Sequence, residues 1–255
     1  MLIFHDLSRQ SEYPTVAALG FFDGVHLGHQ AVIAEARAQA HARGAKCAVF
    51  TFEPPHHTDR TVSKSDVKLL QSAEKRYALM EKLGVELVLC PPFESFYNFS
   101  PEEFVREILK NCLNCRGVVC GEDYRFGRKG AGNAALLREL AEPMGMTVTA
   151  LAPVTVKGET VSSSRIRRCL AEGDTRLAEE LLGMPYTICG EAKRQGTEHS
   201  LQLAPEMARP AEGCYHGLDR THGDRPVLLT LREGCVTWQE DAGEGLVELA
   251  FLGRA

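Results

Sequence analysis

Short apolar runs alternate with amphipathic stretches along the first two thirds of the chain. The apolar runs predict buried strands, at residues 15–19, 47–52, 85–89, 118–120 and 147–151. The amphipathic stretches predict helices, at residues 30–43, 74–83 and 133–144. Ser100-Pro101-Glu102-Glu103 predicts one more helix start, with Ser as N-cap, Pro at N1 and Glu at N3. This alternation predicts a doubly wound α/β fold, whose ligands bind where the strands end, near the topological switch point.

The pattern changes after about Gly183, where short strands are separated by Gly, Pro and charged turns. Candidate strands lie at residues 186–189, 227–231, 235–238 and 246–252. We therefore expect a domain boundary near Met184-Pro185. It would separate an α/β domain over 1–184 from a small all-β domain over 185–255.

Charge and composition narrow the function classes. The 255 residues carry 29 Lys+Arg and 34 Asp+Glu, a net charge of −5, which argues against a nucleic-acid partner but not against a local phosphate site. No apolar run reaches the about 18 residues of a membrane span, and MLIFHDLSRQ does not look like a secretory leader. The nine cysteines, an odd number, favour free thiols. We expect a cytoplasmic protein with no membrane partner; its oligomeric state stays open.

The stretch Gly20–His29 lies between the first predicted strand and the first predicted helix. It is not a Rossmann glycine fingerprint, and it lacks the Gly-Lys-Ser/Thr triplet of a P-loop. Gly28 would let a ligand approach the backbone, and free N–H groups at a helix N-terminus favour an anion. His26 and His29 could then donate to phosphate oxygens. The alternative is a tight turn with two surface histidines.

A second phosphate-type segment is Val161–Arg168, which contains three serines followed by three arginines within seven residues. Serines at a helix start cap the backbone and can also present hydroxyl groups to phosphate. The arginines Arg165, Arg167 and Arg168 add the charge that suits phosphate oxygens. The alternative is a well-capped surface helix with basic residues.

These motifs resemble a known family. GFFDGVHLGH and SSSRIR look like the paired motifs of the nucleotidyltransferase superfamily. The longer match, GFFDGVHLGHQ with TFEP, GEDYRFG and VSSSRIRRCLAEGD, is similar to the FAD synthetase module of prokaryotic bifunctional riboflavin kinase/FMN adenylyltransferases. The resemblance covers roughly residues 15–185. It implies a Rossmann-like doubly wound fold and the conversion of ATP and FMN to FAD and pyrophosphate with Mg²⁺.

The resemblance also implies roles for individual residues. His26 and His29 would stabilise charge on the α-phosphate, Arg167 would hold the triphosphate, and Asp123 would lie beside a Mg²⁺ held mainly by ATP phosphates. Phe126 would stack on the flavin ring. Without the resemblance, Asp123 reads as a turn residue and Phe126 as core. The other residues implied to bind the substrates are Gly20, Phe21, Phe22, Asp23, Gly28, Arg125, Ser162, Ser163, Ser164 and Arg165.

The sequence departs from the family pattern in three places. Phe21 stands where a small polar residue, often Asn, is common, and this change would alter the ATP pocket. Pro55-His56 transposes the usual His-Pro and puts a direct role for His56 in doubt. Ser164 replaces Thr and keeps the hydroxyl group.

The tail resembles a riboflavin kinase barrel that has been cut short. Residues 210–215 and 247–252 look like two of the kinase strands, but the Gly-Phe-Pro-Thr-Ala-Asn segment for ATP and metal is missing. We therefore expect a degenerate, non-catalytic barrel. Two other functions stay open: a nucleotidyltransferase with another phosphate acceptor, and a non-catalytic flavin- or nucleotide-binding regulatory protein.

Three weaker signals are interpreted as structural or left open. Cys112 and Cys115, with Cys120 nearby, lack the second pair of ligands that a structural zinc site needs. His56-His57-Thr58-Asp59 lacks a fourth ligand and predicts an exposed loop. The basic stretch 127–132 could close over a nucleotide or be an ordinary surface loop.

Overall fold

The computed structural model describes residues 1–54, 68–239 and 245–255. Their contacts divide the chain into two compact units, Met1–Ser65 with Arg76–Val154, and Asp66–Lys75 with Thr155–Ala255. Each unit is described by itself. The two units separate between Val154 and Thr155, before the boundary expected near Met184-Pro185. That residues 1–184 and 185–255 have separate functions stays a prediction.

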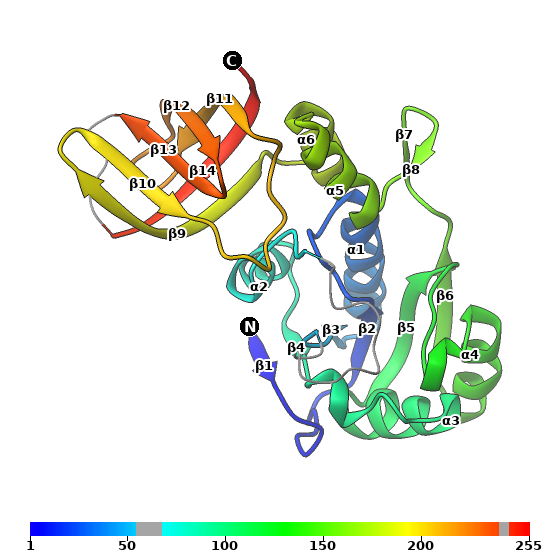
Figure 1. Ribbon diagram of the computed structural model, residues 1–255. Helices are drawn as coiled ribbons and strands as arrows, with labels where there is room; N and C mark the ends of the chain where they lie inside the picture. The colour runs from blue at the N-terminus through cyan, green and yellow to red at the C-terminus, as the bar shows by residue number, and fades with distance from the viewer. Residues whose placement is uncertain (55–67, 240–244) are drawn as a thin grey trace. The chain divides into compact units, whose positions relative to one another are not determined.

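The first unit is built on six parallel strands in the order β1-β4-β3-β2-β5-β6 (Figure 1). The strands are β1 (Leu2–Phe4), β2 (Thr15–Leu19), β3 (Lys46–Phe50), β4 (Leu87–Leu89), β5 (Cys115–Gly121) and β6 (Thr147–Leu151). The five predicted strands are confirmed, and β1, only three residues long, was not predicted. In the sheet, β3 lies on one side of β2 and β5 lies on the other. The order in which strands are added therefore reverses between β2 and β5, and the carboxyl ends of these two strands form the switch point.

Helices cover both faces of this sheet, as predicted. They are α1 (Leu27–Ala42), α2 (Ala73–Lys82), α3 (Pro101–Glu103), which continues as a π-helix over Phe104–Cys112, and α4 (Ala134–Ala141). Helix α1 buries Val32, Ile33, Ala36 and Ala40 and contacts β2, β3 and β5. The predicted capping box is present, since Ser100 Oγ accepts from Glu103 N and the Glu103 carboxylate accepts from Ser100 N.

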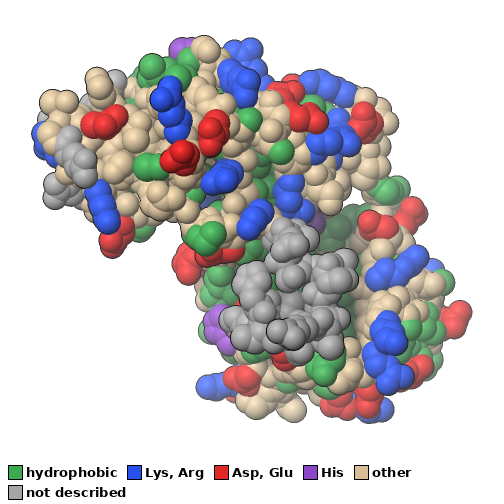
Figure 2. Space-filling model, in the orientation of Figure 1, with side chains coloured by type: hydrophobic (Ala, Val, Ile, Leu, Met, Phe, Trp, Pro, Cys, Tyr) green, Lys and Arg blue, Asp and Glu red, His purple; other side chains and the backbone are tan. Residues whose placement is uncertain are grey.

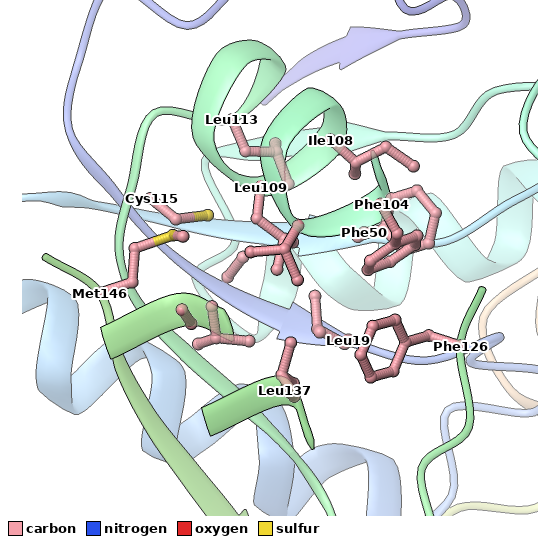
Figure 3. Close-up of a cluster of buried hydrophobic side chains, with 14 of the residues drawn as sticks. Leu19, Phe50, Phe104, Ile108, Leu109, Leu113, Cys115, Phe126, Leu137 and Met146 are labelled. Atoms are coloured by element: carbon pink, nitrogen blue, oxygen red, sulfur yellow. The ribbon is translucent and has the colours of Figure 1, made fainter. Parts of the chain in front are cut away.

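An apolar cluster fills the space between the sheet and the helices of the other face (Figure 3). The π-helix contributes Phe104 and Ile108, and α4 contributes Leu137. Phe50 of β3 meets the ring of Phe104 edge to face, at 5.2 Å between centroids. The cluster therefore fixes the strand ends from which the loops of the switch point leave.

The second unit contains a closed barrel of six antiparallel strands in the order β10-β13-β12-β11-β14-β9 (Figure 1). The strands are β9 (Tyr186–Gln195), β10 (Glu198–Gln202), β11 (Gly213–Asp219), β12 (Arg225–Arg232), β13 (Cys235–Gln239) and β14 (Gly245–Arg254). Alternate residues, among them Tyr215, Trp238 and Phe251, fill its interior. The predicted all-β tail is confirmed. Short as it is, the tail closes completely, because β9 pairs with both β10 and β14.

Two helices and a small hairpin complete the second unit: α5 (Ser163–Glu172), α6 (Thr175–Leu182) and the strands β7 (Thr155–Val156) and β8 (Glu159–Thr160). Helix α6 was not predicted. On the face shown in Figure 2, acidic and basic side chains are interspersed, as the small net charge leads one to expect. Among the described residues, no helix is both long and apolar enough to cross a membrane.

Candidate functional site

The turn between β2 and α1 brings the two histidines of the first motif together. Helix α1 begins at Leu27 and not at Gln30 as predicted, because His26 acts as its N-cap: the His26 Nδ1 atom accepts a hydrogen bond from His29 N at 3.3 Å. Gly28 is therefore a residue of the first helical turn. Both histidines lie at the N-terminus of α1, which the turn of residues 20–26 connects to the carboxyl end of β2, and a helix N-terminus favours an anion.

The two imidazole rings are stacked, with centroids 3.6 Å apart and planes 15° apart. The ring of His26 is buried, at 6% exposed, and the ring of Phe22 lies 5.1 Å from that of His29. Burial, reinforced by the nearby His26 and Arg76, holds the pKa of His29 well below its usual value. His29 is therefore neutral at neutral pH. Its Nδ1 atom is buried and has no partner among the described residues.

The backbone of this turn is strained. Phe22 has a φ of 55° and Val25 a φ of 41°, and the left-handed region is unfavourable for a bulky aromatic residue and still more for a β-branched one. Both side chains are almost fully buried, so packing holds the backbone in this conformation. Strain maintained in this way is characteristic of functional turns.

Residues that follow β3 and a residue of α2 hold the same turn. The carbonyl oxygen of Phe21 accepts hydrogen bonds from Thr51 Oγ1 at 2.8 Å and Arg76 Nη1 at 3.0 Å. The Phe21 ring stacks on Phe52 at 4.9 Å, while Gly20 ends β2 and the Asp23 side chain is buried. Thr51 and Phe52 belong to the TFEP motif. Sequence analysis missed Arg76, although its place on the buried face of α2, beside Leu79 and Met80, was a usable signal.

The GEDYRFG segment follows β5, on the other side of the switch point. Asp123 and Arg125 are exposed there, and Asp123 lies in a turn in which Tyr124 N donates to Gly121 O. Phe126 is only 4% exposed and packs against Phe104, with ring centroids 5.1 Å apart. Phe126 therefore belongs to the core cluster, which is what its sequence context predicts when the family resemblance is left aside. Flavin stacking by this ring stays a prediction that its burial does not favour.

The basic stretch 127–132 forms a tight turn. Phe126 and Gly132 exchange two backbone hydrogen bonds, at 3.2 and 2.8 Å. A Cβ atom on Gly132 would lie 2.5 Å from the Phe126 ring, so only glycine fits there. The turn is fixed to the core at its base.

The second motif forms the start of α5 in the second unit. Ser162 is the N-cap and accepts from Arg165 N at 3.2 Å. The Arg165 side chain is only 8% exposed, and its Nη1 atom donates to the carbonyl oxygens of Val156 at 3.1 Å and Glu159 at 2.9 Å. Arg165 therefore clamps the β7–β8 hairpin, a structural role that the sequence did not reveal.

The other polar residues of the second motif are more accessible. Arg167 is partly buried and its Nε atom donates to Lys68 O at 2.6 Å, while Ser163 is partly buried and Ser164 exposed. Within this unit, Ser164 and Arg167 line a cavity of about 830 Å³ together with Lys68, Ala171 and the loop between β10 and β11. Ser164 and Arg167 thus line a cavity, whereas Nη1 of Arg165 is occupied by backbone carbonyl oxygens.

Within residues 1–54, 68–239 and 245–255, no group of three or more Cys, His, Asp or Glu side chains could hold a metal ion. Cys112 Sγ donates to Leu7 O at 3.2 Å, and Thr15 Oγ1 donates to Cys115 Sγ at 3.5 Å. Burial raises the pKa of Cys112 to about 11 and that of Cys115 to about 12, as expected of core thiols. The predictions for Pro55-His56 and for the loop with His57 and Asp59 concern residues outside the described part of the chain.

Comparison with solved structures supports the fold across the whole chain. The crystal structure titled as a macrolide-efflux protein from Streptococcus pneumoniae matches 100% of this chain and 90% of its own, with a TM-score of 0.88 and 22% identity. At that identity the likeness shows the fold alone.

Comparison with sequences shows the family. The FAD synthetase family profile matches residues 8–165. The bifunctional riboflavin kinase/FMN adenylyltransferase of Listeria monocytogenes is 40% identical over 235 residues, which cover 89% of this chain and 74% of the relative. The enzyme of the same name from Bacillus subtilis is 36% identical over 189 residues, or 73% of this chain and 58% of the relative. With the first motif intact at the switch point of the sheet, the chain belongs to the FAD synthetase family, a family of FMN adenylyltransferases.

Proposed function

We propose that this protein transfers the AMP group of ATP to FMN. An oxygen of the FMN phosphate attacks the α-phosphorus of ATP in line, the bond from that phosphorus to the β-phosphate oxygen breaks, and FAD and pyrophosphate leave. The observation that carries the proposal is the pair of stacked histidines at the N-terminus of α1. Family membership supports the same reaction.

The histidines would act by hydrogen bonding and not by proton transfer. Because the pKa of His29 is held low by burial, its ring is neutral and offers one N–H donor to a phosphate oxygen. A neutral donor in a buried place stabilises the charge that grows on the α-phosphate oxygens in the transition state. The N-terminus of α1 adds the favourable end of the helix dipole. No covalent enzyme intermediate is required.

Mg²⁺ would enter with ATP as part of the substrate. Mg²⁺ retains several water ligands and usually takes only one or two protein carboxylates beside the phosphates. The exposed Asp123, at the carboxyl end of β5, suits such a single contact.

Two residues of α5 would bind the phosphates of ATP. Ser164 and Arg167 line an open cavity, which supports this role, and the partly buried Ser163 stands beside them in the chain. Arg165 would contribute indirectly, since its guanidinium group is occupied by the carbonyl oxygens of the β7–β8 hairpin. We do not assign it a phosphate contact.

The identity of the acceptor rests on the family more than on this site. Phe126, the aromatic residue offered for the flavin, lies in the core. A nucleotidyltransferase acting on another phosphate acceptor is therefore the second candidate. Thermal shifts with FMN, phosphopantetheine, nicotinamide mononucleotide and glycerol phosphate, each with Mg²⁺ and ATP, distinguish the two, since a bound ligand raises the melting temperature. Stabilisation by another acceptor and not by FMN would favour the second candidate.

We also propose that residues 185–255 have lost riboflavin kinase activity, while residues 1–184 carry the transferase. In place of the family's ATP- and metal-binding segment, β9 and β10 are joined by a tight turn in which Arg194 Nε donates to Gly196 O at 2.9 Å. A turn of this size supports the loss, because it has no room for a Mg-ATP loop.

Product analysis tests both proposals. The purified chain is incubated with ATP and Mg²⁺ and either FMN or riboflavin, and flavins are separated by chromatography while pyrophosphate is measured. We expect FAD and an equal amount of pyrophosphate from FMN, and neither FMN nor FAD from riboflavin. No FAD from FMN would overturn the transferase proposal, and FMN formed from riboflavin would overturn the loss of the kinase.

A further inference from the structure

Arg76 is a buried cation near the stacked histidines. It lies on α2, its side chain is 2% exposed, and arginine keeps its charge under all conditions that proteins meet. Its Nη1 atom donates to Phe21 O, and its guanidinium carbon lies 5.4 Å from the centre of the Phe21 ring. Within the described part of the chain it forms no ion pair, and its buried Nε atom has no hydrogen-bond partner.

The contacts of Arg76 do not explain its burial. A charge removed from water costs several kcal/mol unless it is paired and hydrogen-bonded. One carbonyl oxygen and one aromatic face compensate only part of that cost. The carbonyl of Phe21, moreover, does not depend on Arg76, since Thr51 Oγ1 already donates to it at the shorter distance of 2.8 Å. The buried charge therefore calls for an anion.

The surroundings of Arg76 indicate where that anion would bind. Its positive charge helps to lower the pKa of His29, so the two side chains are close enough to interact electrostatically. Both carry a buried nitrogen atom without a partner, Nε in Arg76 and Nδ1 in His29. The N-terminus of α1 directs its dipole to the same place. An anion bound there would interact with the positive charge of Arg76, with the N-terminus of α1 and with neutral hydrogen-bond donors.

We propose that Arg76 is a phosphate-binding residue of this site, and that its guanidinium group supplies the fixed positive charge for a phosphate of the nucleotide at the N-terminus of α1. The ligand class is a nucleoside polyphosphate. The inference rests on the proposed function and deepens it by adding a residue that the motifs do not contain. It makes α2 a third contributor to the switch point, beside the loops that follow β2 and β5.

The test compares ATP with adenosine, which lacks phosphate. Three variants are used: Arg76→Met, Arg76→Lys, and Thr51→Val as the matched control that removes the other donor to Phe21 O without changing charge. By calorimetry, we expect Arg76→Met to weaken ATP binding about 10- to 100-fold, the range for a charge-assisted hydrogen bond, and to leave adenosine binding within about twofold. Arg76→Lys should restore most of the ATP affinity. Thr51→Val should change both ligands alike.

Two readouts without substrate separate this role from an architectural one. Because an unpaired buried charge is unfavourable, the ligand-free Arg76→Met protein should melt at the same or a higher temperature than the parent. Loss of the positive charge should also raise the pKa of His29, followed by its imidazole proton resonances, and Thr51→Val should not. A purely architectural Arg76 would instead lower the melting temperature of the ligand-free Arg76→Met protein.

Equal loss of ATP and adenosine affinity in Arg76→Met would overturn the inference and assign Arg76 to the architecture of the turn. Unchanged ATP affinity would overturn it as well. Because these measurements need no FMN, they are independent of the reaction. A chain that makes no FAD yet shows the expected ATP-to-adenosine ratio would contradict the proposed function and support the role of Arg76.

Discussion

The turn after β2 and the start of α5 look alike in the sequence, since both combine a helix start with groups suited to phosphate. Their structures differ in how the buried polar atoms are satisfied. At the start of α5, Arg165 is buried, and its Nη1 atom is occupied by backbone carbonyl oxygens. In the turn after β2, His29 and Arg76 are left with buried nitrogen atoms that no described residue satisfies. Buried groups that are satisfied internally stabilise the fold, whereas unsatisfied ones point to a ligand.

The comparison predicts a clear division between activity and stability. Substitution of the polar groups at the turn after β2 should lower ligand binding or turnover more than it lowers stability. Substitutions of the buried residues at the start of α5 should do the reverse, while its exposed residues should affect only substrate binding.

The largest effect is expected for His29→Ala. Removing a preorganised donor to the α-phosphate should lower kcat about 100- to 1,000-fold, the range for loss of one such donor. The melting temperature should fall only modestly, because the ring loses its packing against His26 and Phe22 but its Nδ1 atom has no hydrogen bond to lose. FAD formation at saturating ATP and FMN measures this. His41→Ala, an exposed histidine in the last turn of the same helix, is the matched control. A kcat reduced equally in both variants would remove His29 from the mechanism.

Arg165→Met should act mainly on stability. The variant leaves the carbonyl oxygens of Val156 and Glu159 without their donor, which should cost about 2 kcal/mol of the free energy of unfolding. Arg168→Met is the control, since Arg168 is 62% exposed and, like Arg165, lies near the Glu159 carboxylate, at 3.6 Å. The free energy of unfolding of Arg168→Met should stay within about 0.5 kcal/mol of the parent. Denaturant unfolding distinguishes them. Loss of ATP affinity without loss of stability in Arg165→Met would show that the clamp is also a ligand contact.

Sequence patterns were sufficient for the sheet and for the place of the first motif. β2 runs from Thr15 to Leu19 as predicted, because a buried parallel strand is apolar on both faces and ends at a glycine. The start of α1 was misplaced by three residues, since histidine is not a usual N-cap and its Nδ1 contact appears only in three dimensions. Element type thus follows from periodicity, whereas a helix end depends on a single hydrogen bond.

The roles of single polar residues were harder to predict. Arg165 and Arg167 are equivalent in the motif, but only Arg165 is bound by a hairpin whose pairing the sequence does not reveal. Arg76 comes from a helix outside every motif and meets the turn through Phe21. Such assignments depend on contacts between residues far apart in the chain, and one sequence carries no record of them. The buried nitrogen atoms were visible only in the structure.

The pH dependence of stability is the next test. The folded-state pKa of His29 is lowered below its unfolded value, mainly by burial, so the unfolded chain binds the proton more readily. The stability contributed by the neutral ring is complete above a pH of about 6.5 and is lost as the pH falls from there toward the folded pKa. Compared with His29→Gln, the parent should lose more free energy of unfolding between about pH 6.5 and 5. Parallel curves for the two proteins would show that the ring is not held neutral by the fold.

The smallest effect separates two serines of the same motif. Ser162→Ala removes the N-cap of α5 and should cost about 1 kcal/mol in unfolding, because Arg165 N loses its acceptor at 3.2 Å. Ser164→Ala should leave stability within about 0.5 kcal/mol, since the side chain is exposed, and should raise the KM for ATP because Ser164 lines the cavity beside Arg167. Denaturant unfolding and ATP titration on the two variants give the four values needed. The opposite pattern, in which Ser162→Ala raises KM and Ser164→Ala lowers stability, would contradict this division. It would show that a side chain hydrogen-bonded within the protein is not thereby a structural residue of this site.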